Sequence, residues 1–181
     1  KMSSREGSLV YYDDLKHELI KLLVDEVKKR HTDWSEEEVH ATAKKIAFAA
    51  LKFGMLNRDN EKELLFDWQQ SLQLEGETGP YVQYAYARTS SIFRKYEEQF
   101  KRKAAATANE QQLALLKTDE EVKLLKLLQG FPEKALEAAK SHKPAVVARY
   151  LIDVAQAFSN FYDKCPILQA EENLMSARLA L

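Results

Sequence analysis

The sequence contains very little cysteine and histidine. Its one cysteine is Cys165, and its four histidines are scattered along the chain without the spacing of metal ligands. A single cysteine excludes a disulfide framework within these residues and any zinc site that needs several cysteines. We therefore expect no metal site, and this cysteine usage suits a reducing compartment, namely the cytoplasm.

Turn-forming residues and long apolar runs are also scarce. Five glycines and four prolines in 181 residues are fewer than a β-sandwich or a doubly wound sheet of this size needs for its turns. No apolar stretch approaches the ~18 residues of a membrane-spanning helix, so we expect no membrane partner. Apolar residues still make up 45% of the chain, which is enough for a core, and we predict an all-α fold.

An excess of charge of either sign is missing as well. The chain has 27 basic and 28 acidic residues, which gives a formal net charge of -1. Whole-chain charge therefore gives no reason to expect nucleic-acid binding. Any such interaction must depend on a local patch.

Helix signals occur along most of the chain. Ser35 followed by Glu38 has the pattern of a capping box, and Thr78-Gly79-Pro80 is typical of a helix start. Short Gly and Pro junctions predict a bundle in which consecutive helices are antiparallel. The predicted helices run from a cap at Asp13 or Asp14 to about Arg30, from Ser35 to about Phe53 with Gly54 as the stop, from Gly79 past Phe93, from Asp119 to Gly130, from Pro132 to about His142, from Pro144 to Cys165, and from Glu171 to Leu181.

Other stretches are less regular. Residues 57–79 are predicted to be a non-helical connection, and residues 101–112 either an exposed helix or a mobile loop. The apolar face of the first helix is expected to consist of Leu15, Leu19, Leu22 and Leu23.

Two short stretches have side chains suited to phosphate and RNA. KMSSREG, residues 1–7, places a glycine beside hydroxyls and cations, which can hold a phosphate, although such strings are also common in solvated loops. In TGPYVQYAYAR, residues 78–88, Tyr81, Tyr84 and Arg88 share one helical face. They could stack on unpaired bases and contact phosphate, or they could be a buried Tyr pair with an Arg closing a salt bridge.

A third stretch, ARYLIDVAQAFSNFYDKCPIL at residues 148–168, has the longest clean helical period in the chain. This period predicts a core helix. Near the end of that helix, Asn160 and Tyr162 could reach outward from it.

In this order, the three stretches resemble one family closely: the arginyl-tRNA synthetases, which are class I aminoacyl-tRNA synthetases. KMSSREG is similar to the KMSKS loop in the variant form of that family. FDW at residues 66–68, followed by TGPYVQYAYAR, resembles the entry into the anticodon-binding domain, and residues 150–165 resemble its later core helix. The resemblance covers nearly the whole chain, and KFGMLN at residues 52–57 departs from it.

The resemblance implies a domain organisation. Residues 1–12 would be the end of a catalytic domain with the KMSKS loop, 13–74 a helical connecting segment that contacts the tRNA stem, and 75–181 an anticodon-binding helical bundle of the DALR type. We expect the catalytic domain with its HIGH motif to lie upstream, and the family's chain to continue beyond the equivalent of Leu181. The chain alone is then expected to be inactive.

The resemblance also implies an activity. Arginine attacks the α-phosphate of ATP, and the arginyl group then passes to the 3′-terminal ribose of its tRNA. ATP and L-arginine are the expected substrates of the full-length enzyme, with Mg²⁺ accompanying ATP. Lys1, Ser3 and Arg5 would contact ATP, and Ser4 stands where many class I enzymes have a second lysine.

The partner implied is arginine tRNA, bound by a protein that we expect to be a monomer. Lys101, Arg102 and Lys103 would add phosphate contacts by charge, although a basic run is usually a solvated face. The residues proposed to bind tRNA are Tyr81, Gln83, Tyr84, Arg88, Arg94, Lys95, Asn160 and Tyr162.

Three alternatives remain open. A related class I enzyme, such as the cysteine enzyme, also has a helical anticodon domain, but its KMSKS loop usually keeps the second lysine. A free-standing helical RNA-binding or interaction module would have no ligase activity. A plain helical bundle without a ligand predicts that Tyr81 and Tyr84 are both buried and that RNA does not bind.

Overall fold

The computed structural model describes residues 11–59, 73, 76–105 and 107–181. Within these ranges the regular structure is entirely α-helical, so the predicted all-α fold is confirmed. None of the helices in the described part is long and apolar enough to cross a bilayer. The helices are α1 (Tyr12–Arg30), α2 (Glu36–Leu56), α4 (Gly79–Phe100), α5 (Glu110–Leu113), α6 (Asp119–Gln129), α7 (Phe131–Ser141), α8 (Pro144–Lys164) and α9 (Glu172–Ala180).

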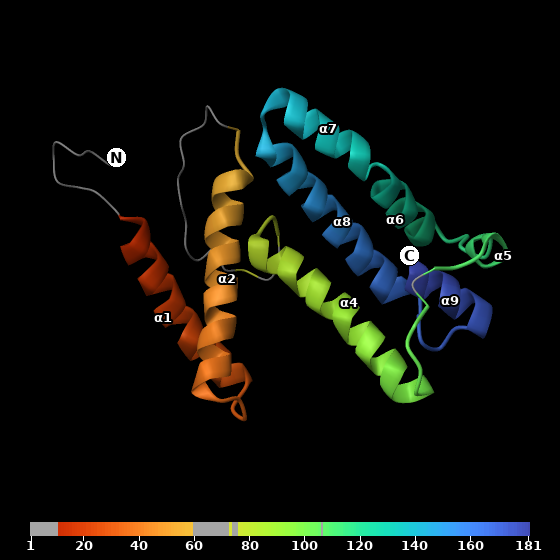
Figure 1. Cartoon of the computed structure of the whole chain (residues 1–181), viewed down its shortest axis with the longest axis horizontal. Helices are drawn as coiled ribbons and strands as arrows, with labels where there is room; N and C mark the ends of the chain where they lie inside the picture. Colours follow the sequence, from red (N-terminus) through yellow and green to blue (C-terminus); the bar gives the residue numbers. More distant parts are fainter. Residues whose placement is uncertain (1–10, 60–72, 74–75, 106) are drawn as a thin grey trace.

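The helices are arranged around α8 and α4 (Figure 1). At one end of the molecule, α1 and α2 pack against each other as a hairpin, and α2 also contacts α4. Helices α6 and α7 pack along α8 on the side away from α4, and the short α5 contacts α9 at the other end. The segment after α8 therefore lies close to the end of the bundle where α6 and α9 meet.

Two main hydrophobic clusters stabilise this arrangement. The first joins α1 to α2 through Leu19, Leu23, Val39 and Leu51 among others. The second joins α4, α6, α8 and α9, and Phe161 at its centre is 2% exposed. Burial of a large side chain such as Phe161 contributes about 1.5–3 kcal/mol.

Close packing of α4 on α2 requires the glycine at the start of α4. A Cβ built on Gly79 would lie 2.3 Å from the carbonyl oxygen of Ala49 and 2.9 Å from the Cβ of Phe53. No side chain fits at that separation, so only glycine lets the first turn of α4 contact the backbone of α2. Thr78 caps this turn by accepting a hydrogen bond from the Tyr81 N–H over 3.1 Å.

Several helix ends agree with the sequence prediction. The capping box of Ser35 and Glu38 is present, and α4 begins at Gly79. The helices from Asp119, Pro132 and Pro144 appear as α6, α7 and α8 within one residue of their predicted starts. These ends depend on neighbours within one turn, which is why the local pattern identifies them.

Other local predictions are wrong. Asp13 and Asp14 lie in the first turn of α1, whose N-cap is Tyr11 without a side-chain cap. Gly54 does not end α2, because the helix continues to Leu56. Leu22 is 54% exposed, since the core face of α1 runs through Leu19, Leu23 and Val27 instead.

The sequence predicts no definite structure for two connecting stretches, residues 57–79 and 101–112, beyond the absence of a packed helix. In residues 101–112, the described part is irregular up to Asn109, and α5 then forms a single turn. Most of the connection predicted at 57–79 lies outside the described residues, as does the FDW stretch.

Candidate nucleic-acid interface

A groove of about 630 Å³ runs between the middle of α4 and the end of α8. One wall comes from α4, and the opposite wall comes from the end of α8 and the segment that follows it. Polar and apolar side chains both line it. The residues used below are Tyr84, Arg88 and Lys95 on the first wall, and Tyr162, Asp163, Pro166, Ile167, Leu168 and Gln169 on the second.

Arg88 lies at the centre of this groove. Its guanidinium carbon is 4.6 Å from the ring centroid of Tyr84 and 4.6 Å from that of Tyr162. Its Nη2 donates a 2.6 Å hydrogen bond to the Tyr84 hydroxyl, and its Nη1 lies 3.8 Å from the Asp163 carboxylate. Both rings are within cation–π range, so one planar cation and two aromatic rings form a compact cluster open to solvent.

Tyr81, although on the same helix, belongs to the core. It is 9% exposed and packs with Ala85 and Ala155, and its hydroxyl lies within hydrogen-bond distance of Gln156 and Ser159. In this packing the ring has no free face for a base. The face expected from the spacing of residues 81, 84 and 88 is therefore divided between core and groove.

Tyr84 distinguishes this arrangement from a bundle without a ligand. That alternative requires both tyrosines to be buried, but Tyr84 is 42% exposed. Tyr162 is 36% exposed in the same groove. Two accessible aromatic rings beside a cation are the features that single-stranded nucleic acid uses for stacking and phosphate contact.

The remaining candidates are spread around this cluster. Lys95 is exposed and lines the groove, whereas Arg94 is exposed outside it and donates to Ser91. Asn160 is half-buried on α8 and does not line the groove. Arg102, from the basic run after α4, forms an ion pair of 2.7 Å with Glu172 instead of being free.

Gln83 has a different position, at the contact between α4 and α2. Its Nε2 donates a hydrogen bond of 3.2 Å to the backbone carbonyl of Lys45. Its Oε1 is buried and has no hydrogen-bond partner among the residues that the structure describes. Gln83 thus joins the two helices and does not face the groove that holds Arg88.

A second groove of about 570 Å³ adjoins the first on the other side of Tyr84. Helices α1, α2 and α4 line it, and Tyr84 and Ala87 belong to both grooves. Leu22 and Ile46 give it an apolar floor, and Arg30 and Lys45 place basic groups at it. The two grooves therefore lie on either side of Tyr84 and Ala87.

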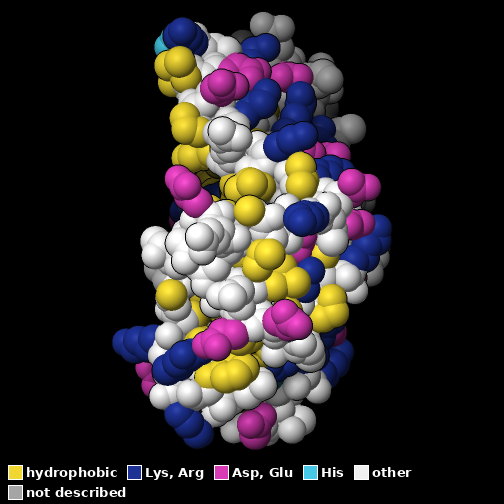
Figure 2. Space-filling model, turned by 90° about the vertical axis from the view of Figure 1, so that its right-hand side faces the viewer, with side chains coloured by type: hydrophobic (Ala, Val, Ile, Leu, Met, Phe, Trp, Pro, Cys, Tyr) yellow, Lys and Arg dark blue, Asp and Glu magenta, His cyan; other side chains and the backbone are white. Residues whose placement is uncertain are grey.

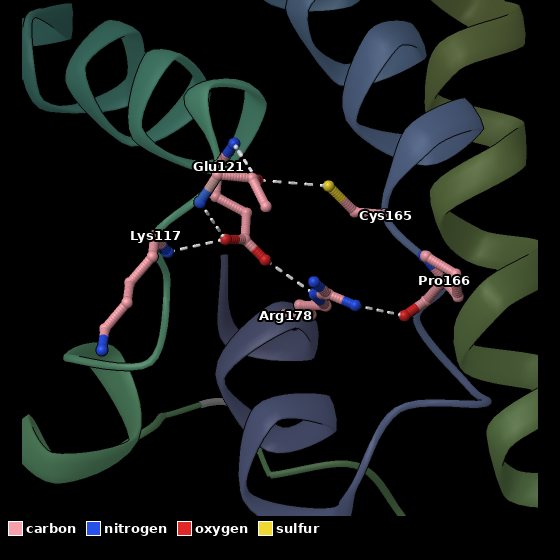
Figure 3. Close-up of polar contacts among 6 residues, drawn as sticks. Lys117, Glu121, Cys165, Pro166 and Arg178 are labelled. Atoms are coloured by element: carbon pink, nitrogen blue, oxygen red, sulfur yellow. Dashed lines mark hydrogen bonds and ion pairs between the residues drawn. The ribbon is translucent and has the colours of Figure 1, made fainter.

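A buried ion pair lies behind the second wall of the first groove (Figure 3). Glu121 is 1% exposed, and its Oε1 accepts a 2.7 Å hydrogen bond from Nε of Arg178. Its Oε2 accepts from the backbone N–H groups of Lys117 and Thr118 over 2.8 and 2.9 Å. Both carboxylate oxygens are thereby satisfied.

These contacts keep Glu121 ionised. Burial alone raises its pKa, but the Thr118 and Lys117 N–H groups and the Arg178 guanidinium outweigh that effect, so the pKa lies below its ordinary value of 4.5. The nearby Glu120 is partly buried and pairs with the exposed Lys164.

Arg178 also reaches the groove wall. Its Nη1 donates a 2.6 Å hydrogen bond to the carbonyl of Pro166, the first of the four consecutive residues that line the groove after α8. Sequence reasoning did not identify this pair. The Thr118–Glu121 capping box, which the structure contains, was a signal for Glu121, but no local pattern points to Arg178.

The distribution of charge matches the nearly neutral net charge. Figure 2 views the molecule from the side of α5 and α9, where Lys and Arg side chains are interspersed with Asp and Glu and do not form one basic face. In the described part of the chain, no group of His, Cys, Asp and Glu could hold a metal ion. Lys1, Ser3 and Arg5 lie outside the described residues.

Comparisons with known proteins agree on one family. Residues 82–181 match the model of the DALR anticodon binding domain. The chain is 37% identical to the arginine–tRNA ligase of Clostridium kluyveri and 39% identical to that of Clostridium perfringens. In each case the match covers 100% of this chain and 31% of the relative.

Solved structures give the same result. The Thermus thermophilus arginyl-tRNA synthetase is similar with a TM-score of 0.83 and 31% identity, covering 96% of this chain and 29% of that one. The arginyl-tRNA synthetase of Plasmodium falciparum has a TM-score of 0.77 at 22% identity, which supports the fold. The chain thus spans about a third of the length of the relatives that it matches.

Proposed function

Because the chain belongs to the DALR anticodon-binding domain family, we propose that it supplies the tRNA-binding helical part of an arginine–tRNA ligase. The relatives named arginine–tRNA ligase match along the entire chain, which supports arginine over another amino acid. The partner is then arginine tRNA. The work of these residues is recognition, which is distinct from the chemical step.

The observation that carries this proposal is the cluster of Arg88, Tyr84 and Tyr162. Unpaired bases of an RNA loop are commonly held by stacking on aromatic rings and on guanidinium planes. Here both kinds of group lie in one groove, where the two rings are exposed and the Arg88 guanidinium is partly buried beside them. Lys95 adds a cation on the same wall, suited to a phosphate of the loop backbone.

The groove between α1, α2 and α4 extends this surface toward the proposed stem-contact segment. Arg30 and Lys45 are suited to phosphates of a duplex, and they lie beside the apolar floor made by Leu22 and Ile46. An RNA stem that continues from a loop held near Arg88 would pass this region. The hairpin of α1 and α2 therefore orients the stem in the proposed complex.

The rest of the activity belongs to the whole ligase. In this proposal the ligase uses ATP, with Mg²⁺, to activate L-arginine and then transfers it to tRNA for protein synthesis. Lys1, Ser3 and Arg5 contribute the KMSKS-loop contacts to ATP, where fixed cations offset the charge that develops on the phosphates. The protein acts in the cytoplasm as a monomer.

Fluorescence anisotropy with labelled arginine tRNA tests the proposal. Tyr84→Ala should weaken binding about tenfold, the size of one lost base–aromatic stack. Tyr86→Ala is the matched control, since Tyr86 is on the same helix and 74% exposed but lines neither groove. Equal binding by both variants, or equal binding of arginine tRNA and a non-cognate tRNA, would contradict recognition at this groove.

A further inference from the structure

The geometry points to Arg178 as a positioning residue for the RNA-binding groove, because it joins the buried carboxylate of Glu121 to the carbonyl of Pro166. This inference rests on the proposed function, since the groove is taken to bind tRNA. Arg178 itself lies behind the wall and lines neither groove. It acts by fixing residues 166–169, which lie on the same wall as Tyr162 and face Arg88 across the groove.

The fixed end of this connection is Glu121. Its side chain is 1% exposed, and its two oxygens accept three hydrogen bonds, two of them from backbone N–H groups at the start of α6. A carboxylate held by backbone donors has little freedom to move. The Arg178 side chain, 9% exposed, is therefore anchored at Nε by a rigid partner (Figure 3).

The other end is Pro166, which has few ways to be held. Proline has no N–H, so its backbone can be fixed by hydrogen bonding only through its carbonyl. Among the described residues, the hydrogen bond given to that carbonyl is the one from Arg178 Nη1 at 2.6 Å. The planar fork of arginine can serve Glu121 and Pro166 together, and the single ammonium of a lysine has no such geometry.

The two residues that follow Pro166 belong to the hydrophobic core and also line the groove. Ile167 is 7% exposed and belongs to the cluster around Phe161, and Leu168 packs against that cluster. Both also line the groove opposite α4. A shift at Pro166 would therefore change the width of the groove as well as the packing beneath it.

Cys165 offers a local probe of this segment. It is the only cysteine of the chain, it precedes Pro166 directly, and it is 2% exposed. Its Sγ lies 3.4 Å from the Thr118 hydroxyl, next to Glu121. A thiol reagent can reach it only when the segment moves away from α6, so its modification rate measures how firmly the wall is held.

The test compares Arg178→Lys with Arg149→Lys in the 181-residue chain. Arg149 is the matched control because it also forms an ion pair, with Asp59, but it lies near the start of α8, lines neither groove and does not touch Pro166. Cys165 modification by a chromogenic disulfide reagent is timed with and without saturating arginine tRNA, and tRNA affinity is measured by anisotropy. Circular dichroism verifies that each variant is folded.

We expect Arg178→Lys to raise the rate of Cys165 modification about tenfold and to lower the affinity for tRNA about tenfold. Each change is the effect of losing one charge-assisted hydrogen bond. Arg149→Lys should leave both unchanged, and bound tRNA should slow the modification in the unsubstituted chain. Should Arg178→Lys not fold, Glu121→Gln replaces it, since it keeps the shape but weakens the contact to Arg178.

Three results would overturn the inference. An unchanged Cys165 rate would show that Arg178 does not hold the segment. A faster rate with unchanged tRNA affinity would show that the wall does not position the groove for RNA, while the proposed function would stand. Absence of tRNA binding by the unsubstituted chain would overturn both the inference and the proposed function. In the second result the unsubstituted chain does bind tRNA, so the two outcomes are distinguishable.

Discussion

The guanidinium carbon of Arg88 lies 4.6 Å from the ring centroid of Tyr162. This contact brings α4 and α8 together at one point of the surface, where the groove opens to solvent. A cation against an exposed ring contributes about 0.5–1 kcal/mol to stability, so the pair is held only weakly and is free to exchange for another planar partner.

Arg88→Lys should reduce affinity for arginine tRNA about tenfold. Lysine keeps the charge but loses the planar group that stacks on the two rings and can stack on a base. Arg149→Lys is the control, because Arg149 is an exposed arginine of α8 that lines neither groove. Anisotropy over a salt titration should give similar slopes for both variants, and equal affinities would show that only charge matters at Arg88.

Gly79→Ala should destabilise the fold by about 1–3 kcal/mol, the usual cost of overpacking a close contact. The added Cβ would lie 2.3 Å from the Ala49 carbonyl oxygen, which is backbone and cannot turn aside. Gly130→Ala is the matched control, since the nearest atom to its Cβ would be 3.4 Å away. Urea unfolding of the two variants measures the difference, and equal stabilities would mean that α4 can move off α2 without cost.

Removing Arg178, the ion-pair partner of Glu121, should lower the free energy of unfolding more than Gly79→Ala does. Arg178→Met leaves a buried carboxylate without its cation, and the loss of one partner of a buried pair costs about 3–5 kcal/mol. Arg149→Met removes an ion pair with Asp59 whose side chains are 60% and 32% exposed, and should cost under about 1 kcal/mol. Chemical unfolding at neutral pH tests this, and equal losses would rule out a strong contribution from the buried pair.

The same carboxylate predicts a dependence on pH. Because the pKa of Glu121 is lower in the folded chain than its ordinary value of 4.5, its contribution is fully present above that value and is lost as the pH falls through the folded pKa. The free energy of unfolding of Glu121→Gln should therefore change less between neutral pH and strongly acidic pH than that of the unsubstituted chain. Parallel curves would contradict a lowered pKa.

Leu22→Glu should weaken tRNA binding through the groove of α1, α2 and α4. An acidic group there repels phosphates drawn by Arg30 and Lys45, and it also breaks the apolar floor. Leu136→Glu is the matched control, because Leu22 and Leu136 are both 54% exposed but Leu136 is on α7, away from both grooves. Equal affinities would remove this groove from the proposed binding surface.

Local sequence patterns predict the helices and most of their ends. Ser35 with Glu38, Gly79 with Pro80, and Pro144 each act within one turn, so the local pattern contains the information needed. The ordered motifs likewise led to the family that the comparisons support. At Gly54 a helix-stop signal falls inside a helical pattern, and the prediction that the helix ends there is wrong. Helix α2, which packs against α1 and α4, continues to Leu56.

Which side chains are available for binding depends on contacts between the helices. Tyr81 and Tyr84 lie on one face by spacing, yet contacts with α8 bury the first and leave the second exposed. Tyr162 joins Arg88, and Arg178 joins Glu121 and Pro166, across long stretches of sequence. Such contacts depend on how helices pack, and the helical period of each segment specifies only its own apolar face.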